Sequence, residues 1–382
     1  MGEKTTLGVY IHIPFCKSKC PYCGFNSFAV SPIPERGYVS ALLREFSCLL
    51  RTEELGERIQ GVGTVYLGGG TPSLLSPPEA ARLLNGIGRG LCIADGAEVT
   101  LETNPDTVDA GKLKGFKDAG INRLTIGVQS FNHQELKRLG RTHSEEKAER
   151  VFFEARDAGF KNIGIDLIFG IPGQTLKGWE GSISTAVKLR PEHLSIYNLT
   201  IEKGAGYYSA FKNKELQLPS EKEEAGMYIA ALKIFKDNGY KHYEVSNLSL
   251  PGFESRHNTN YWLGKNYTGL GAGAHSYLAW PGWGRRWWNE KKPGRYMELV
   301  NTEGTARSGG ERLSKDEAEL EALMLGLRLV KGIKKSDFKK RFGKSPAGLL
   351  CREGLVDCGL IRNTGENIAL TEKGILFSNE VF

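Results

Sequence analysis

Six short apolar runs dominate the first half of the chain, and each is followed by a loop rich in Gly, Pro or polar residues and then by a helical stretch. The runs are residues 8–13, 64–67, 98–101, 123–128, 162–169 and 193–199. A repeat of strand, loop and helix is typical of parallel βαβ units. Six consecutive units predict an α/β fold, built as an incomplete TIM-like (β/α)6 barrel.

The repeat ends after a helix expected at residues 220–238, and the rest of the chain has a different composition. Ser314 and Glu317 have the spacing of a capping box, which predicts the start of a helix, and residues 359–374 are typical of a β-hairpin. We expect three parts: a partial-barrel core at 1–240, an aromatic and Gly-rich region packed on it at 241–310, and a winged-helix-like C-terminal domain at 311–382.

The chain contains no apolar run near the roughly 18 residues that a membrane span needs. Its first segment, "MGEKTTLGVYIHIPF", lacks a basic leader followed by a long apolar stretch, so we expect a cytoplasmic protein in a reducing compartment. The formal net charge of +7 is compatible with an anionic ligand or with peripheral association with a membrane surface, and does not by itself indicate nucleic acid. Composition predicts no oligomeric state.

Three of the seven cysteines, Cys16, Cys20 and Cys23, fall within eight residues directly after the first expected strand. In a reducing compartment such a cluster favours metal binding or catalysis over disulfides. In Cys-x3-Cys-x2-Cys, the thiolates can hold three corners of a cubane iron–sulfur cluster and leave the fourth iron open to a small molecule. A zinc site or unrelated free thiols are the alternatives. Cysteines expected to be dispensable are Cys48, Cys92, Cys351 and Cys358.

Small and polar residues follow the later expected strands. Gly69 and Gly70 in "LGGGTPS" would let a ligand approach the backbone, with a tight structural turn as the alternative. No Gly-Lys-Ser/Thr ending marks a phosphate loop. Glu102 ends its strand as a carboxylate suited to ribose hydroxyls. Gln129 and Asp166 lie near later strand ends. Each could be structural alone, but catalytic groups of parallel barrels gather at this edge.

Together these motifs resemble the radical S-adenosylmethionine (SAM) proteins of the oxygen-independent coproporphyrinogen oxidase superfamily, almost from end to end. In that superfamily, the open iron of a [4Fe-4S] cluster chelates the amino and carboxylate groups of SAM. The resemblance implies that Tyr10 lies beside SAM, that Gly69, Gly70 and Thr71 meet its methionine end, and that Glu102 meets its ribose.

The resemblance also matches Gln129, Arg141 and Asp166 to positions that contact a second SAM in the oxidase. These residue types are compatible with a second nucleotide without establishing one. Arg141, in "LKRLGRTH", is otherwise a solvated charge at the end of a helix.

The oxidase itself resembles the pattern Cys-x3-Cys-x2-Cys-x-Cys, and Phe25 stands at the position of its fourth cysteine. Only fifteen residues precede Cys16, which leaves little room for the oxidase's longer N-terminal arm. Both departures resemble the HemW branch of heme chaperones. The segment "RHNTNYW", with His257, Tyr261 and Trp262, is similar to the HNxxYW heme-binding signature of that branch. Histidine is a common axial ligand of heme iron, although a histidine bonded within an aromatic core is the structural alternative.

Two further segments bear on ligands. Residues 280–288 combine four tryptophans with Arg285 and Arg286, a set that could pack on a porphyrin and bind its propionates, or form an ordinary aromatic core. We treat His12 as structural. The basic stretch 331–344 makes DNA binding conceivable on a winged helix, but a solvated helix face is commoner, and we expect no nucleic acid partner.

The resemblance therefore implies a heme chaperone on a radical SAM scaffold, with a [4Fe-4S] cluster, SAM and heme as ligands and recipient hemoproteins as partners. The alternative is a SAM-dependent coproporphyrinogen oxidase, which would remove carboxylate from a propionate by oxidative decarboxylation. The sequence leaves open whether the protein is an enzyme.

Overall fold

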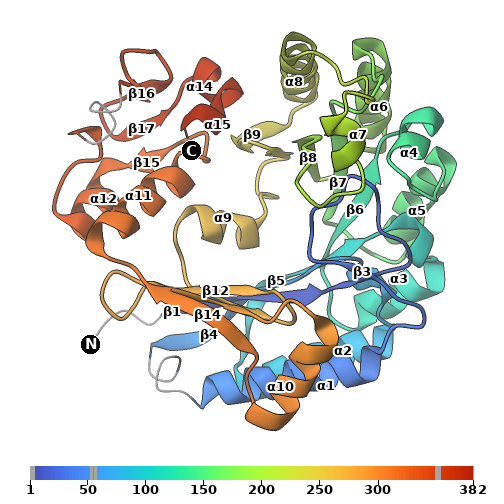
Figure 1. Ribbon diagram of the computed structural model, residues 1–382, viewed down its shortest axis with the longest axis vertical. Helices are drawn as coiled ribbons and strands as arrows, with labels where there is room; N and C mark the ends of the chain where they lie inside the picture. Colours follow the sequence, from blue (N-terminus) through green and yellow to red (C-terminus); the bar gives the residue numbers. More distant parts are fainter. Residues whose placement is uncertain (1–4, 52–54, 56–57, 349–353, 382) are drawn as a thin grey trace.

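The computed structural model describes residues 5–51, 55, 58–348 and 354–381 (Figure 1). Its centre is a curved sheet in which six parallel strands follow one another in chain order. They are β1 (Thr5–Ile13), β4 (Ile59–Gly69), β5 (Ile93–Thr103), β6 (Arg123–Gln129), β7 (Ile163–Phe169) and β8 (His193–Asn198). All six predicted strands are confirmed. Because β1 and β8 do not pair, the barrel is incomplete.

Helices cover the outer face of this sheet (Figure 1). On α2, the buried residues are Ala80, Leu83, Leu84 and Ile87, the spacing of one helical face against a sheet. The strands beneath are apolar on both faces, as in β7, where only Asp166 is less than fully buried. The helices are α1 (Glu35–Leu50), α2 (Pro77–Gly90), α3 (Ala110–Asp118), α4 (His133–Arg138), α5 (Glu145–Asp157), α6 (Leu176–Leu189), α7 (Tyr208–Lys212) and α8 (Glu221–Asp237).

The aromatic region extends the same sheet at both ends. The hairpin of β9 (Lys241–Glu244) and β10 (Asn247–Ser249) pairs with β8. At the other end β11 (Tyr267–Leu270) pairs with β1, and three antiparallel strands follow. These are β12 (His275–Leu278), β13 (Arg285–Asn289) and β14 (Arg307–Arg312); α9 (Arg256–Trp262) and α10 (Pro293–Glu303) complete the region. Backbone hydrogen bonds therefore join the region expected at 241–310 to the core.

The C-terminal part combines short helices with a three-stranded sheet. Ser314 and Glu317 form the predicted capping box at the start of α11 (Lys315–Gly326). The predicted hairpin consists of β16 (Ile361–Asn363) and β17 (Asn367–Leu370), and β15 (Ile333–Lys334) pairs with β17. The remaining helices are α12 (Lys335–Phe342), α14 (Glu372–Leu376) and α15 (Ser378–Val381). Cys351 lies outside the described residues.

Among the helices that the structure describes, none has the length and apolar character needed to cross a bilayer.

Candidate functional site

Cys16 ends β2 (Phe15–Cys16), and Cys20 and Cys23 lie in the loop between β2 and β3 (Phe28–Ala29), beyond the carboxyl end of β1. Cys16, Cys20 and Cys23 are partly buried and unbridged, and all three line one pocket of about 530 Å³. The carboxyl ends of the neighbouring parallel strands supply other walls of this pocket. The cysteine loop therefore occupies the edge of the sheet where barrel proteins place their chemistry.

Each of the three sulfurs contacts a polar group that can donate a hydrogen bond. The hydroxyl Oγ1 of Thr71 donates to Cys16 Sγ at 3.4 Å, and Nη1 of Arg141 donates to Cys20 Sγ at 3.7 Å. The hydroxyl of Ser27 lies 4.0 Å from Cys23 Sγ. Burial raises the pKa of the Cys16 thiol, so its thiolate needs a compensating positive charge. Donors placed at all three sulfurs fit thiolate ligands of a metal cluster.

The three thiols are the candidate metal ligands of this pocket. In the described part of the chain, no three histidine, cysteine or carboxylate side chains converge closely enough to hold one metal ion. A cubane cluster presents an iron at each of several corners, so its thiolates need not converge. The donor set fits a [4Fe-4S] cluster.

The glycine turn after β4 is held against Glu102. The backbone N–H of Gly69 donates to Glu102 Oε2 at 3.1 Å, and the hydroxyl of Tyr66 donates to Oε1 at 2.8 Å. Gly69 has φ +114°, and a Cβ there would lie 2.6 Å from the His12 ring. Packing therefore requires this glycine, whatever ligand approaches it. Burial raises the pKa of Glu102 to about 7, which places a titratable carboxyl in the pocket wall.

Gln129, Arg141 and Asp166 also line the cysteine pocket. Gln129 has φ +70°, a conformation that a non-glycine side chain rarely adopts and that often marks functional positions. Arg141 bridges the Gly127 carbonyl, at 2.9 Å, and Cys20. Asp166 Oδ1 is buried without a hydrogen-bond partner among the described residues, and burial raises its pKa to about 6. An unpartnered buried carboxylate oxygen is a place for a ligand hydroxyl or amine.

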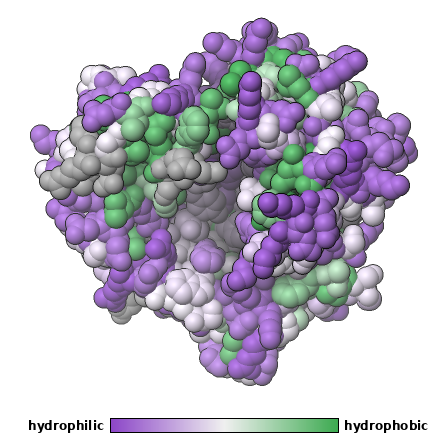
Figure 2. Space-filling view, turned by 45° about the horizontal axis from the view of Figure 1, so that its top comes forward, coloured by the Kyte–Doolittle hydropathy of each residue, from purple (hydrophilic) through white to green (hydrophobic). Residues whose placement is uncertain are grey.

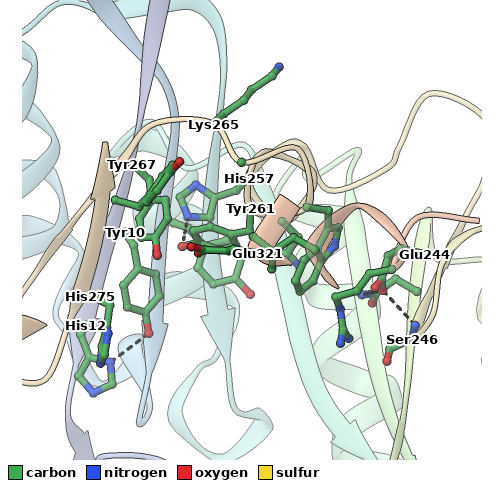
Figure 3. A pocket seen from close by; sticks show the side chains of 18 of the residues that line it. Tyr10, His12, Glu244, Ser246, His257, Tyr261, Lys265, Tyr267, His275 and Glu321 are labelled. Carbon is green, nitrogen blue, oxygen red and sulfur yellow. Dashed lines mark hydrogen bonds between the residues drawn. The ribbon is translucent and has the colours of Figure 1, made fainter. Parts of the chain in front are cut away.

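A second, larger cavity of about 780 Å³ adjoins this pocket. Figure 2 shows the face of the molecule hollowed near its middle, and Figure 3 shows the side chains within. The two hollows share a wall that includes Phe25, Tyr66, Glu102 and Asn258. Beyond this shared wall, the lining includes residues of β1, α9, the strands β11 and β12, and the C-terminal part. These are Tyr10 and His12, His257 and Tyr261, Tyr267, His275 and Tyr277, and Glu321 and Arg341.

The C-terminal part is tied to this cavity by polar contacts. Arg341 of α12 donates from Nη2 to the Tyr277 hydroxyl at 2.9 Å, and Arg286 of β13 pairs with Glu321 of α11 at 3.4 Å. The guanidinium of Arg328 lies 4.4 Å from the centre of the Trp262 ring. At least one cation of the basic stretch 331–344 therefore points inward to the cavity and not to solvent.

His257 belongs to the cavity wall but has both ring nitrogens occupied. Nδ1 lies 2.8 Å from Thr64 Oγ1, and Nε2 lies 2.8 Å from the Tyr261 hydroxyl (Figure 3). The residue is 1% exposed, and burial lowers its pKa to about 3, so the imidazole is neutral. Its backbone N–H and that of Arg256 donate to Glu98 at the start of α9. In this geometry His257 attaches α9 to the sheet.

Tyr10 and the aromatic segment 280–288 lie in places that differ from the ligand contacts expected of them. Tyr10 lines the larger cavity and not the cysteine pocket, and its ring stacks 6.2 Å from that of Tyr66, which lines both. In the segment 280–288, Trp287 is buried and Arg286 is paired with Glu311 and Glu321. The other three tryptophans of the segment, Trp280, Trp283 and Trp288, are half-buried, and no residue of 280–288 lines the larger cavity.

Several residues that line these hollows gave no signal in the sequence. Tyr66 alternates with Gly68 on β4, and strand periodicity could have placed it on the same face as the glycine turn. Arg123, Tyr197 and His275 carry no motif, and Glu321 belongs to a helix far along the chain. Only the folded chain brings these side chains to one place.

Comparison with known proteins decides the family. Residues 10–186 match the radical SAM superfamily, and residues 313–377 match the HemN C-terminal domain. The chain is 38% identical to "Heme chaperone HemW" of Bacillus subtilis over 98% of this chain and 97% of that one. It is 37% identical to the Lactococcus lactis protein of the same name, over 98% and 95%. The chain belongs to the HemW family.

This HemW family member is also similar to a mouse protein, "Radical S-adenosyl methionine domain-containing protein 1, mitochondrial", at 34% identity over 87% of this chain and 75% of that one. Among solved structures, coproporphyrinogen III oxidase (HemN) from Escherichia coli has a TM-score of 0.84 and 23% identity, covering 99% of this chain and 89% of that one. That likeness confirms the fold: an α/β radical SAM barrel with a HemN-type C-terminal domain.

Proposed function

We propose that this member of the HemW family is a heme chaperone, which binds heme in the larger cavity and delivers it to recipient hemoproteins. The observation that carries the proposal is the cavity itself, about 780 Å³ in volume and directly beside the cysteine pocket. Relatives named as heme chaperones match the chain over nearly its full length. A cavity of this size suits a ligand as large as a porphyrin.

The chemistry of the walls suits an iron porphyrin. The rings of Tyr10, Tyr66 and Tyr267 offer flat apolar faces, and Arg341 at the rim offers a guanidinium for a propionate. Aromatic faces and a few placed cations are the groups that recognise a flat ligand carrying two carboxylates. Phe25, which is 68% exposed, adds a further ring at the boundary with the cysteine pocket.

We further propose that Cys16, Cys20 and Cys23 hold the [4Fe-4S] cluster. With SAM bound, a reduced cluster supplies one-electron chemistry. Thr71 and Arg141 donate hydrogen bonds to the sulfurs of Cys16 and Cys20. Hydrogen bonds to thiolate ligands stabilise their negative charge and tune the reduction potential of such clusters.

SAM is proposed to lie along the strand ends of the same pocket, with its methionine end at Gly69, Gly70 and Thr71. Glu102 accepts the ribose hydroxyls, since its carboxylate lies in the shared wall. Tyr10 is proposed to lie beside this SAM. Gln129, Arg141 and Asp166, which line the same pocket, are the residues proposed to contact a second SAM. We place the protein in the cytoplasm, where a net charge of +7 allows peripheral contact with an anionic membrane surface.

The deciding experiment compares heme binding with oxidase turnover. Protein reconstituted anaerobically with iron and sulfide is titrated with heme and followed by its absorption spectrum, and a second sample receives coproporphyrinogen, SAM and a reductant. We expect one heme per chain, transfer of that heme to an apo-hemoprotein acceptor, and no decarboxylated porphyrin. Sustained decarboxylation by the wild-type protein would overturn the chaperone proposal in favour of the oxidase.

A further inference from the structure

Three histidines line the larger cavity, and they differ in whether their ring nitrogens are hydrogen-bonded. His12 donates from Nε2 to the carbonyl of Asn26 at 2.8 Å, so its Nδ1 accepts from the Tyr10 hydroxyl at 3.0 Å. His257 has both nitrogens bonded, to Thr64 and Tyr261. Within the described part of the chain, the ring of His275 makes no hydrogen bond, although it lines the same cavity. An axial ligand needs a free nitrogen lone pair, which only the third ring offers.

The two bonded histidines are also deeply packed. His12 is 7% and His257 1% exposed, whereas His275 is among the exposed residues at the start of β12. To ligate iron, His257 would have to break its bond to Tyr261 and leave that buried hydroxyl unpaired. His275 needs no such rearrangement.

The strand that carries His275 holds its backbone firmly. His275 lies opposite Trp288 in the β12–β13 ladder, and the two rings stack with centres 5.8 Å apart at 28°. Ser276, the next residue, is buried and donates to the Gly269 carbonyl, so alternation places Tyr277 on the face that His275 occupies. Both lie in the cavity wall. Trp288 supports one side of the imidazole and limits its rotation.

The surroundings of His275 suit an anionic iron porphyrin. Burial and the charges of Lys291 and Arg286 lower the pKa of its ring, which keeps the imidazole neutral as metal ligation requires. The side chain of Asn26 donates to the carbonyls of Ala272 and Lys291, both at 3.0 Å, and so joins the cysteine loop to the turn before β12 and to the segment after β13. Figure 3 shows His275 beside His12, at the end of the cavity away from Glu244.

We infer that His275, and not His257, is the axial ligand through which this protein holds the iron of its heme. His257 instead positions α9 and the Tyr261 ring that forms part of the cavity. The inference rests on the proposed heme-binding function, and names the residue that performs it.

The test compares two variants with the wild-type full-length protein under heme titration. In His275→Ala, we expect the absorption and electron paramagnetic resonance signatures of nitrogen ligation to be lost and the dissociation constant for heme to rise about tenfold. Free imidazole added to that variant should restore the signature. In His257→Ala, we expect the ligated spectrum to persist while the melting temperature falls. His133→Ala, on the exposed face of α4, controls for the loss of any histidine.

The outcomes distinguish the role of His275 from the proposed heme-chaperone function. If the wild-type protein binds no heme, both the ligand assignment and the chaperone function are wrong. If it binds heme and His275→Ala keeps the wild-type spectrum, the ligand assignment is wrong and the chaperone function stands. A folded His257→Ala protein that loses the signature, with rescue by imidazole, would return the role to His257.

Discussion

The cysteine pocket and the aromatic cavity share a wall, but the chain builds them in opposite ways. The three cysteines of the pocket fall within eight residues, and Gly69 and Glu102 end neighbouring parallel strands. The cavity takes its side chains from β1, α9, β12 and α11, which are separated by up to three hundred residues. The spacing of residues in the sequence therefore predicts the first site. The second site depends on the pairing of β11 with β1 and on the position of the C-terminal part, which local sequence does not show.

The difference extends to polar groups. In the pocket, Asp166 keeps an unpartnered oxygen, and Cys16 is a thiol whose pKa burial raises. Such groups are left for a ligand to satisfy. In the cavity wall, the ring nitrogens of His12 and His257 are already hydrogen-bonded within the chain. A residue that matches a motif is thus available for ligand binding only if the fold leaves its polar atoms free.

The largest expected effect tests whether the pocket depends only on its local cysteines. Replacement of Cys16, Cys20 or Cys23 by Ala should abolish the cluster, because each holds one corner. Iron and sulfide per chain after anaerobic reconstitution measure this. Cys48→Ala and Cys92→Ala are matched controls, since these cysteines lie away from the pocket, and should keep the full iron content. Cluster loss in either control, with retention in Cys23→Ala, would contradict the assignment.

A smaller effect is expected at Glu102, where the two sites meet. Glu102→Gln should weaken SAM binding about tenfold while the iron content stays unchanged, because an amide accepts hydroxyl bonds less strongly than a carboxylate. Calorimetric titration with SAM measures it. Glu79→Gln on α2, a half-buried carboxylate that pairs with Arg82 and does not line the pocket, is the matched control. Equal SAM affinity in Glu102→Gln and wild type would remove Glu102 from the nucleotide site.

Position 69 is a poor test of SAM binding. Gly69→Val would force a branched side chain to adopt φ +114° and to overlap the His12 ring, so it should unfold the turn as well as disturb the ligand. A loss of SAM binding in that variant says nothing about the nucleotide unless folding is intact.

Ionisation of Glu102 should have a smaller effect, seen in how the melting temperature depends on pH. Its pKa is raised by burial from 4.5 to about 7, so its contribution to stability is complete below about pH 4.5 and is lost as the pH rises through 7. Without SAM, Glu102→Gln should therefore melt at a higher temperature than wild type at pH 8 and at nearly the same temperature at pH 5. Melting curves at the two pH values decide. A difference that is larger at pH 5 would contradict the raised pKa.

The smallest effect is expected at Phe25, on the boundary of the two hollows. Phe25→Ala removes an exposed ring that can pack on a porphyrin, so heme affinity should fall about threefold while the melting temperature is unchanged. Heme titration and a melting curve measure the two quantities. Phe153→Ala, another exposed ring on the outer helix α5, is the matched control. If Phe25→Ala loses as much affinity as Phe153→Ala, Phe25 takes no part in binding.

Local sequence patterns predicted much of the architecture. The six parallel strands, the α8 helix, the capping box at Ser314 and the C-terminal hairpin all follow from local patterns, because strand alternation, helix caps and turns are local properties. The pairing of β11 with β1 was not readable, since strand partners distant in sequence leave no local mark. That pairing carries His275 to the cavity.

The sequence by itself determined the class of protein and the grouping of Cys16, Cys20 and Cys23, because the spacing of residues that share a loop is written in the chain. Only the tertiary structure decided which histidines are free. Thr64 and Tyr261 engage His257 from a strand and a helix, and the ladder with Trp288 leaves the ring of His275 open to the cavity. The physical reason is that hydrogen bonding competes with metal ligation for the same nitrogen lone pairs, and the partners that win this competition come from distant parts of the chain.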